Sequence, residues 1–241
     1  MVAKNEGTIM KKICVYCGKE ATTRDHVPPK GFFREPFPAN LKTVPACFDC
    51  NNGNSADEDY LRNVFAMSYE EGNISTEIAK DVWEQKVTRT IGKNKKFLND
   101  ISNSFKDINV FQDGKYLGKK ASFKIEREKV EKAISKMIRG LYYIEYNSIL
   151  DPSYEIRIFE NIELSIFPQN VVNDVFSKPI KQFGEGVVRY RTTRAKEDPN
   201  FSIWVINFYN YRYMYFVCFS YAKDFLSLNK GEFGLPSVQN I

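Results

Sequence analysis

The stretch that decides the fold at the front of the chain is C-V-Y-C-G-K-E-A-T-T-R-D-H-V-P-P, residues 14–29, with its counterpart P-A-C-F-D-C-N, residues 45–51. It contains two Cys-x-x-Cys pairs, Cys14/Cys17 and Cys47/Cys50, which are separated by 29 residues. From residue 11 to about 54 the chain is rich in Cys, Pro, Gly and Asn, and only short β-like pieces interrupt this composition. An ordinary hydrophobic core cannot hold such a segment, so we expect another source of stability.

The two cysteine pairs predict a structural Zn²⁺ site. Each pair is typical of a metal knuckle, and four thiolates fill a tetrahedral shell and leave no position open for water. Metal binding of this kind contributes about 10–16 kcal/mol in small zinc peptides, enough to fold a segment that is poor in core residues. The alternative is a set of buried or redox-active thiols. Cys218, among aromatic and β-branched residues, is instead predicted to lie in the core.

His26 is the only histidine among the 241 residues, and it stands between Asp25 and Val27-Pro28-Pro29. A β-like segment is expected around Thr22-Thr23 and is stopped by the prolines, and a second segment is expected at residues 40–44. Asn51 directly follows the last cysteine. A zinc ion that clamps strand, loop, strand and helix start would direct Asp25, His26 and Asn51 toward one point. Taken singly, residues of these types more often cap turns or loops.

These residues resemble the HNH nucleases, also called His-Me finger or ββα-metal nucleases. The matching residues are C-V-Y-C (14–17), D-H-V-P-P (25–29), N-L-K-T-V-P-A-C (40–47) and C-N (50–51), which cover about the first sixth to quarter of the chain. The resemblance implies that His26 is a general base and that Asp25 and Asn51 bind a catalytic divalent metal, Mg²⁺ or Mn²⁺. It also implies that Asn40 braces the loop and orients the histidine.

The sequence departs from the family pattern in two places. The interval from Asn40 to Asn51 is somewhat longer than in many members, and Ser55 stands one helical turn past Asn51, where many members carry histidine or lysine. Further metal contacts are candidates at Asn54, Asp57 and Glu58. Ser55 and Glu58 have the spacing of a capping box, however, so Glu58 is expected to cap a helix.

Phosphodiester hydrolysis needs residues of these types. A hard cation such as Mg²⁺ prefers oxygen ligands and keeps several waters, so one carboxylate and one amide oxygen suffice to anchor it. Such a cation stabilises the charge that develops as water attacks phosphorus in line. An imidazole with a pKa near ~6.5 accepts a proton at neutral pH.

The periodicity of the remaining sequence predicts a mixed architecture. The expected elements are helices over 55–69, 75–91, 94–105 and 127–146, a hairpin that turns at Asp113-Gly114, and strands over 154–159, 186–194, 201–209 and 212–219. We therefore predict an α+β protein. A zinc-stapled ββα-metal (HNH) module is expected over residues 1–72, followed over residues 73–241 by an accessory region, which is a helical region and a C-terminal antiparallel β-sheet.

Charge points to a polyanionic partner. The formal net charge is +5, and the basic surplus lies in residues 61–150, which hold 17 basic and 12 acidic side chains. Candidate nucleic-acid contacts are Arg24, Lys93, Lys95 and Lys96, although solvated lysine faces are common. The expected partner is nucleic acid, with double-stranded DNA favoured, and a protein partner or an oligomer contact is a candidate through the C-terminal region. No apolar run is long enough for a membrane span and no secretory signal is recognisable, which predicts a cytoplasmic protein.

Together these observations predict a metal-dependent HNH endonuclease that hydrolyses nucleic acid. The resemblance is compatible with restriction, phage defence or mobile-element roles. Two alternatives stay open. One is a catalytically inactive zinc-binding module that binds nucleic acid or protein, and the other is an effector nuclease that is active only with a partner.

Overall fold

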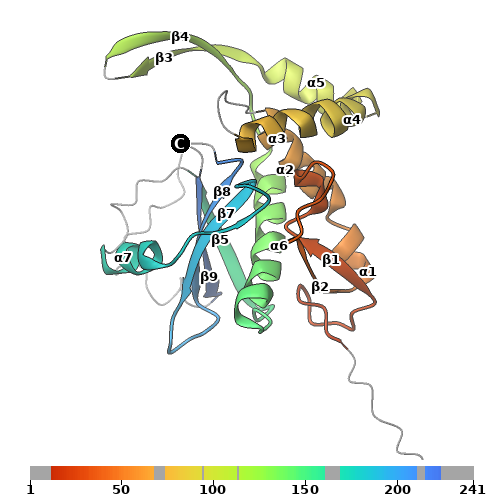
Figure 1. The fold of residues 1–241 in the computed structure, drawn as a ribbon, viewed down its shortest axis with the longest axis vertical. Helices are drawn as coiled ribbons and strands as arrows, with labels where there is room; N and C mark the ends of the chain where they lie inside the picture. Colours follow the sequence, from red (N-terminus) through yellow and green to blue (C-terminus); the bar gives the residue numbers. More distant parts are fainter. Residues whose placement is uncertain are drawn as a thin grey trace, which may run out of the picture.

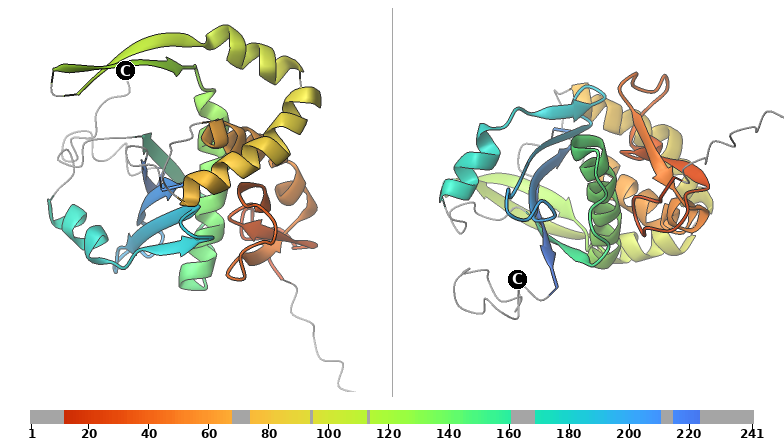
Figure 2. Two further views of the ribbon diagram at one scale, coloured as in Figure 1. Left: turned by 45° about the horizontal axis from the view of Figure 1, so that its top comes forward. Right: turned by 90° about the horizontal axis from the view of Figure 1, so that it is seen from below.

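Helix α6 (Arg127–Tyr146) runs through the middle of the molecule, with the cysteine-rich front on one side and a five-stranded sheet on the other (Figures 1 and 2). The structure is a computed structural model, and it describes residues 12–67, 74–93, 95–112, 114–160, 169–210 and 215–223. The helix buries residues on more than one face because it packs against both neighbours. Its buried residues include Ile134, Met137 and Leu141.

The front of the chain is a two-stranded ribbon followed by helices. Strands β1 (Thr23–Val27) and β2 (Lys42–Ala46) pair antiparallel, with His26 opposite Thr43. A single 3-10 turn, η1 (Lys30–Phe32), lies in the loop between them. The ribbon leads into the short helix α1 (Phe48–Asn52) and then into α2 (Ser55–Met67).

A helical layer and a projecting hairpin follow the front segment. The helices are α3 (Ile74–Val82), the π-helical turn η2 (Trp83–Val87), α4 (Thr88–Lys93) and α5 (Lys95–Ser104). Strands β3 (Lys106–Gln112) and β4 (Lys115–Ser122) form a hairpin that extends away from the rest of the molecule (Figure 1).

The C-terminal sheet is antiparallel, and its strand order is β5-β9-β8-β7-β6. Its strands are β5 (Tyr154–Glu160), β6 (Lys181–Phe183), β7 (Val188–Arg194), β8 (Ser202–Phe208) and β9 (Tyr215–Ala222), and helix α7 (Gln169–Ser177) precedes β6. Strands β8 and β9 are each paired along both edges, and their buried aromatic residues include Trp204, Phe208 and Phe216.

One hydrophobic cluster joins the front, the helices and the sheet, and it extends from Val15 to Cys218. The ring of Phe65 in α2 stacks on that of Phe208 in β8 with centroids 4.6 Å apart. The hydroxyl of buried Tyr209 donates to the backbone oxygen of Phe32 at 2.9 Å. The front segment is therefore packed onto the rest of the chain through a shared core.

The α+β prediction, with a C-terminal antiparallel sheet, is confirmed. Most of the predicted elements lie within a few residues of the observed ones, and Cys218 is buried as expected. The helix predicted over 75–91 is divided by the π-helical turn, and strand β6 was missed because it has only three residues. The module boundary predicted near residue 72 lies outside the described residues.

The predicted capping box at the start of α2 is wrong. The hydroxyl of Ser55 donates to the backbone oxygen of Asn52 at 2.8 Å, and the Glu58 carboxylate lies 2.7 Å from the ammonium of Lys136. An ion pair with a buried ammonium is stronger than a hydrogen bond to an exposed helix end, so the tertiary contact overrides the local pattern.

Gly140 allows α6 to approach the ribbon closely. A Cβ atom at this position would lie 2.5 Å from Cγ2 of Val27 in β1. We expect Gly140→Ala to lower the free energy of unfolding by about 1–3 kcal/mol through overpacking, measured by urea denaturation. Gly92→Ala is the matched control, because a Cβ there meets nothing within 4 Å and helix propensity then favours alanine.

A Val27→Ala background tests the cause of this effect. It removes the methyl groups that the new Cβ would meet, so Gly140→Ala should cost less there than in the native protein. Equal costs in both backgrounds would show that the contact with Val27 does not explain the requirement for glycine.

Candidate metal centre and adjoining ionic cluster

The four paired cysteines meet at one point. The sulfur atoms of Cys14, Cys17, Cys47 and Cys50 all lie within 4.8 Å of one another, close enough to bind one metal ion. All four thiols are free of disulfides. The first pair lies on a turn before β1, and the second pair spans the end of β2 and the first turn of α1, so the cluster joins three elements.

The spacing of the sulfurs fits a tetrahedral ion. With Zn–S bonds of about 2.3 Å, the edge of a tetrahedral ZnS₄ unit is about 3.8 Å. The Sγ atoms of Cys17 and Cys47 are 3.7 Å apart. Four thiolates at this distance repel one another strongly unless a cation lies among them, and thiolates are the ligands that Zn²⁺ prefers.

Backbone geometry supports both knuckles. The N–H of Gly18 donates to the carbonyl of Cys14 at 3.0 Å, and Gly18 has the positive φ of 76° that closes this turn. At the second knuckle, Cys47 caps α1, and its sulfur accepts the N–H of Cys50 at 3.4 Å. This N–H lowers the pKa of the Cys47 thiol and so favours the thiolate that binds metal.

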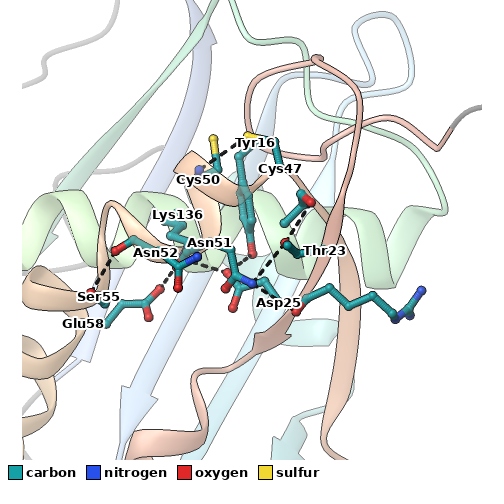
Figure 3. Close-up of polar contacts among 12 residues, drawn as sticks. Tyr16, Thr23, Asp25, Cys47, Cys50, Asn51, Asn52, Ser55, Glu58 and Lys136 are labelled. Atoms are coloured by element: carbon teal, nitrogen blue, oxygen red, sulfur yellow. Dashed lines mark hydrogen bonds and ion pairs between the residues drawn. The ribbon is translucent and has the colours of Figure 1, made fainter.

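Asp25 is buried beside the metal centre, on the face of β1 that turns toward α6. The residue is only 7% exposed. One carboxylate oxygen, Oδ2, accepts the hydroxyl of Tyr16 at 3.0 Å and lies 2.8 Å from Nζ of Lys136 (Figure 3). Burial, followed by the charge of Asp25, raises the pKa of Tyr16, so its hydroxyl stays protonated and donates.

Lys136 of α6 provides the cation of this ionic cluster, which consists of Asp25, Glu58 and Lys136. The residue is 5% exposed, and its ammonium contacts Asp25, Glu58 at 2.7 Å and the backbone oxygen of Asn51 at 3.4 Å. Burial alone would lower the pKa of Lys136, but the carboxylates of Glu58 and Asp25 outweigh it, and the pKa is raised. The ammonium therefore stays charged.

Asn51 has a fixed amide orientation beside Asp25. Its Nδ2 donates to Oγ1 of Thr23 at 3.1 Å and to the backbone oxygen of Arg24 at 3.2 Å. A carbonyl oxygen only accepts hydrogen bonds, so the nitrogen must face Arg24 and Oδ1 must face the other way. Oδ1 of Asn51 and Oδ1 of Asp25 accept no hydrogen bond from the residues that the structure describes.

His26 lies on the other face of β1. Adjacent strand residues point to opposite faces, and the burial pattern shows Asp25 and Val27 buried with half-buried His26 between them. Within the described parts of the chain, the imidazole makes no hydrogen bond. Burial and then the charge of Lys30 lower the pKa of His26, while Asp25 opposes them. The structure thus places Asp25 and Asn51 against Lys136 and His26 on the opposite face of the strand, so the predicted convergence of the three side chains on one point is not observed, because adjacent strand residues alternate in direction.

The other predicted site residues lie in different surroundings. Nδ2 of Asn40 donates to the backbone oxygen of Gln182 in β6 at 2.9 Å, so this asparagine links the front loop to the C-terminal sheet, and no hydrogen bond joins it to His26. Exposed Arg24 donates through Nε to Oγ1 of Thr43 at 2.8 Å. Lys93 ends α4 and Lys95 and Lys96 begin α5, but their side chains lie outside the described part of the structure.

Sequence reasoning missed Tyr16 and Lys136 and assigned Glu58 to a different role. Tyr16 stands inside the first Cys-x-x-Cys pair, a position that the metal centre brings next to β1. Lys136 was recognisable as a charge on a buried helical face, because it lies one turn from Ala133 and Gly140, both buried. The partner of that charge becomes visible only in three dimensions.

Comparisons with known proteins found no matching family model, no matching curated protein and no matching solved structure. Among the described residues, no helix combines the length and apolar character that a membrane span requires.

The four-sulfur cluster predicts the metal content of the protein. Native protein purified without chelator is expected to carry one zinc ion per chain, and Cys47→Ser should lose it and destabilise the front segment. Cys218→Ala is the matched control, since it removes a buried cysteine away from the cluster. Elemental analysis of both variants checks this, and equal zinc in the two would contradict the assignment.

Proposed function

We propose that the protein is a metal-dependent endonuclease of the HNH type that hydrolyses phosphodiester bonds in nucleic acid, with double-stranded DNA as the favoured substrate. The observation that carries the proposal is that Asp25 and Asn51 both contact Lys136 beside a four-cysteine cluster, and that Oδ1 of each accepts no hydrogen bond from the described residues. The ordered motifs that resemble HNH nucleases support the same assignment. Zn²⁺ is the proposed structural ion.

Asp25 and Asn51 are the proposed ligands of a catalytic Mg²⁺ or Mn²⁺. Both ions prefer oxygen donors, and a site with few protein ligands leaves room for water and phosphate oxygens. The hydrogen bonds of Oδ2 in Asp25 and of Nδ2 in Asn51 leave one oxygen of each side chain available. A divalent ion bound there would stabilise charge on the phosphate and on the leaving oxygen.

His26 is the proposed general base. In an in-line displacement, the attacking water and the leaving oxygen lie on opposite sides of phosphorus, so the base and the ligands of the divalent ion have to approach from different sides. Consecutive Cα atoms are about 3.8 Å apart, so side chains on the two faces of β1 can flank a phosphate at the strand edge. The lowered pKa of His26 keeps its imidazole neutral and able to accept a proton.

Arg24 is the proposed phosphate contact nearest to this site. It shares the outer face of β1 with His26 through the two-residue period of the strand, and its hydrogen bonds to Thr43 hold its guanidinium there. Lys93, Lys95 and Lys96 remain proposed contacts farther along the substrate. Contacts of this type make binding fall with rising salt concentration.

One observation favours a second candidate function. The Asp25 carboxylate already forms an ion pair with the ammonium of Lys136 and accepts a hydrogen bond from the hydroxyl of Tyr16. A carboxylate satisfied in this way can serve structure alone, and the protein would then be a zinc-binding module that binds nucleic acid or protein without cleavage. The remaining alternative is an effector nuclease that needs a protein partner, and such a protein would not cleave nucleic acid on its own.

Replacement of the histidine separates cleavage from binding. We expect zinc-loaded native protein to nick plasmid DNA with Mg²⁺ or Mn²⁺, and His26→Ala to be about 10²–10⁴-fold slower, because it lacks the base. Lys132→Met, which removes an exposed ion-paired charge on α6, is the matched control and should retain activity. Equal inactivity of native protein and His26→Ala in every metal, despite bound zinc, would favour the module without cleavage.

The pH dependence of cleavage should follow the titration of His26. The neutral imidazole is the active form, so the rate should rise with pH. Because the pKa of His26 is lowered, the rate should reach its plateau at a lower pH than it would with a histidine at the ordinary pKa of 6.5. Since the chain has one histidine, NMR of tag-free protein gives this titration without assignment. A rate that is flat across the NMR transition would exclude His26 as the base.

A further inference from the structure

The ammonium of Lys136 occupies a position built from oxygens. Its neighbours are Oδ2 of Asp25 at 2.8 Å, Oε1 of Glu58 at 2.7 Å and the backbone oxygen of Asn51 at 3.4 Å. An ammonium has three donors and no acceptor, so these three oxygens match its hydrogen-bonding capacity. The same set, two carboxylates and a carbonyl, is also the type of donor set that hard divalent cations bind.

The charge of the ionic cluster depends on this lysine. Asp25 and Glu58 contribute two negative charges, Lys136 contributes one positive charge, and the Tyr16 hydroxyl is neutral. The side chain of Lys136 is 4% exposed, and those of Asp25 and Glu58 are 10% and 16% exposed. Without the ammonium, two carboxylates would face each other with little water to screen them, and a cation would be strongly attracted.

The lysine reaches this position from a fixed support. Lys136 and Gly140 lie one turn apart on α6, and they face Asp25 and Val27, which lie two residues apart on β1. Because Gly140 lets the helix approach the strand, the ammonium is delivered to the carboxylates by packing of the core rather than by a mobile surface side chain.

We infer that Lys136 is a tethered cation that fills the position between Asp25, Glu58 and Asn51, and that a divalent ion takes this position when the ammonium is removed. Lys136 thereby keeps Glu58 from becoming a metal ligand and restricts divalent binding to the free oxygens of Asp25 and Asn51. The inference deepens the proposed function and rests on it for the assignment of Asp25 as a ligand. Lys136 acts through its neighbours and is a positioning residue.

Counting bound Mn²⁺ tests this inference. Zinc-loaded, tag-free full-length protein is titrated with Mn²⁺, and free Mn²⁺ is measured from its electron paramagnetic resonance signal. We expect Lys136→Met, which keeps the length of the side chain and removes its charge, to bind one Mn²⁺ more per chain than the native protein. Binding of Mn²⁺ should also raise the thermal midpoint of this variant more than that of the native protein.

Three variants isolate the cause. Lys136→Arg keeps the positive charge and should not gain an ion. Lys136→Met combined with Glu58→Gln restores the net charge of the native ionic cluster, and the additional ion should be lost. Lys132→Met, on the same helix but paired with exposed Glu128, should bind Mn²⁺ like the native protein.

The outcomes are decisive in each case. An unchanged number of bound ions with an unchanged affinity in Lys136→Met would overturn the inference. If this variant folds only with Mn²⁺ present, that result supports it, and a failure to fold even with Mn²⁺ contradicts it. The Mn²⁺ bound by the native protein tests the proposed function, whereas the difference between variant and native protein tests the role of Lys136, so the two can fail separately.

Discussion

The convergence of four sulfurs is the constraint on which the front of the molecule depends. Cys14 and Cys17 lie on one turn, and Cys47 and Cys50 lie where β2 ends and α1 begins, all with their sulfurs within 4.8 Å. The segment between them, with its prolines and asparagines, has few residues that pack. Once the ends are held, β1 and β2 can pair, and Asn51, the residue after the last cysteine, lies against the backbone of β1. The metal centre thus sets the position of the proposed ligands.

The second constraint is the ionic contact between this front segment and α6. Lys136, Asp25 and Glu58 are partly or fully buried, and an ion pair in such surroundings adds less stability than its Coulomb energy suggests, because all three groups lose hydration. Breaking it is costly, however, because the carboxylates would remain buried without their cation. The contact therefore specifies how α6 and the ribbon dock, and Gly140 sets the distance. The front segment shares its core and its charges with the rest of the chain.

Much of the fold follows from local patterns in the sequence. The apolar stripe of α6, the alternating strands of the C-terminal sheet and the pairing of β3 with β4 depend on residues close together in the chain, so their period and turn chemistry suffice to predict them. The spacing of the cysteines likewise predicts their meeting. The role of Glu58 was beyond such reasoning, since a capping box and an ion pair with a residue 78 positions away look identical in one sequence.

The candidate site shows the same division. Asp25, His26 and Asn51 were recognisable as chemistry-bearing residues, but the direction of each side chain depends on strand alternation and on the partners that α6 provides. Asn40, which contacts Gln182 in the distant sheet, illustrates how a tertiary contact gives a motif residue a different neighbour from the one that its family resemblance suggests.

The most direct measurement is diffraction from crystals of the zinc-loaded protein soaked in Mn²⁺, with data collected at the zinc and manganese absorption edges. We predict a zinc peak among the four sulfurs and a manganese peak within bonding distance of Oδ1 of Asp25 and Oδ1 of Asn51. A manganese peak elsewhere, or none beside these two oxygens at saturating Mn²⁺, would contradict this prediction.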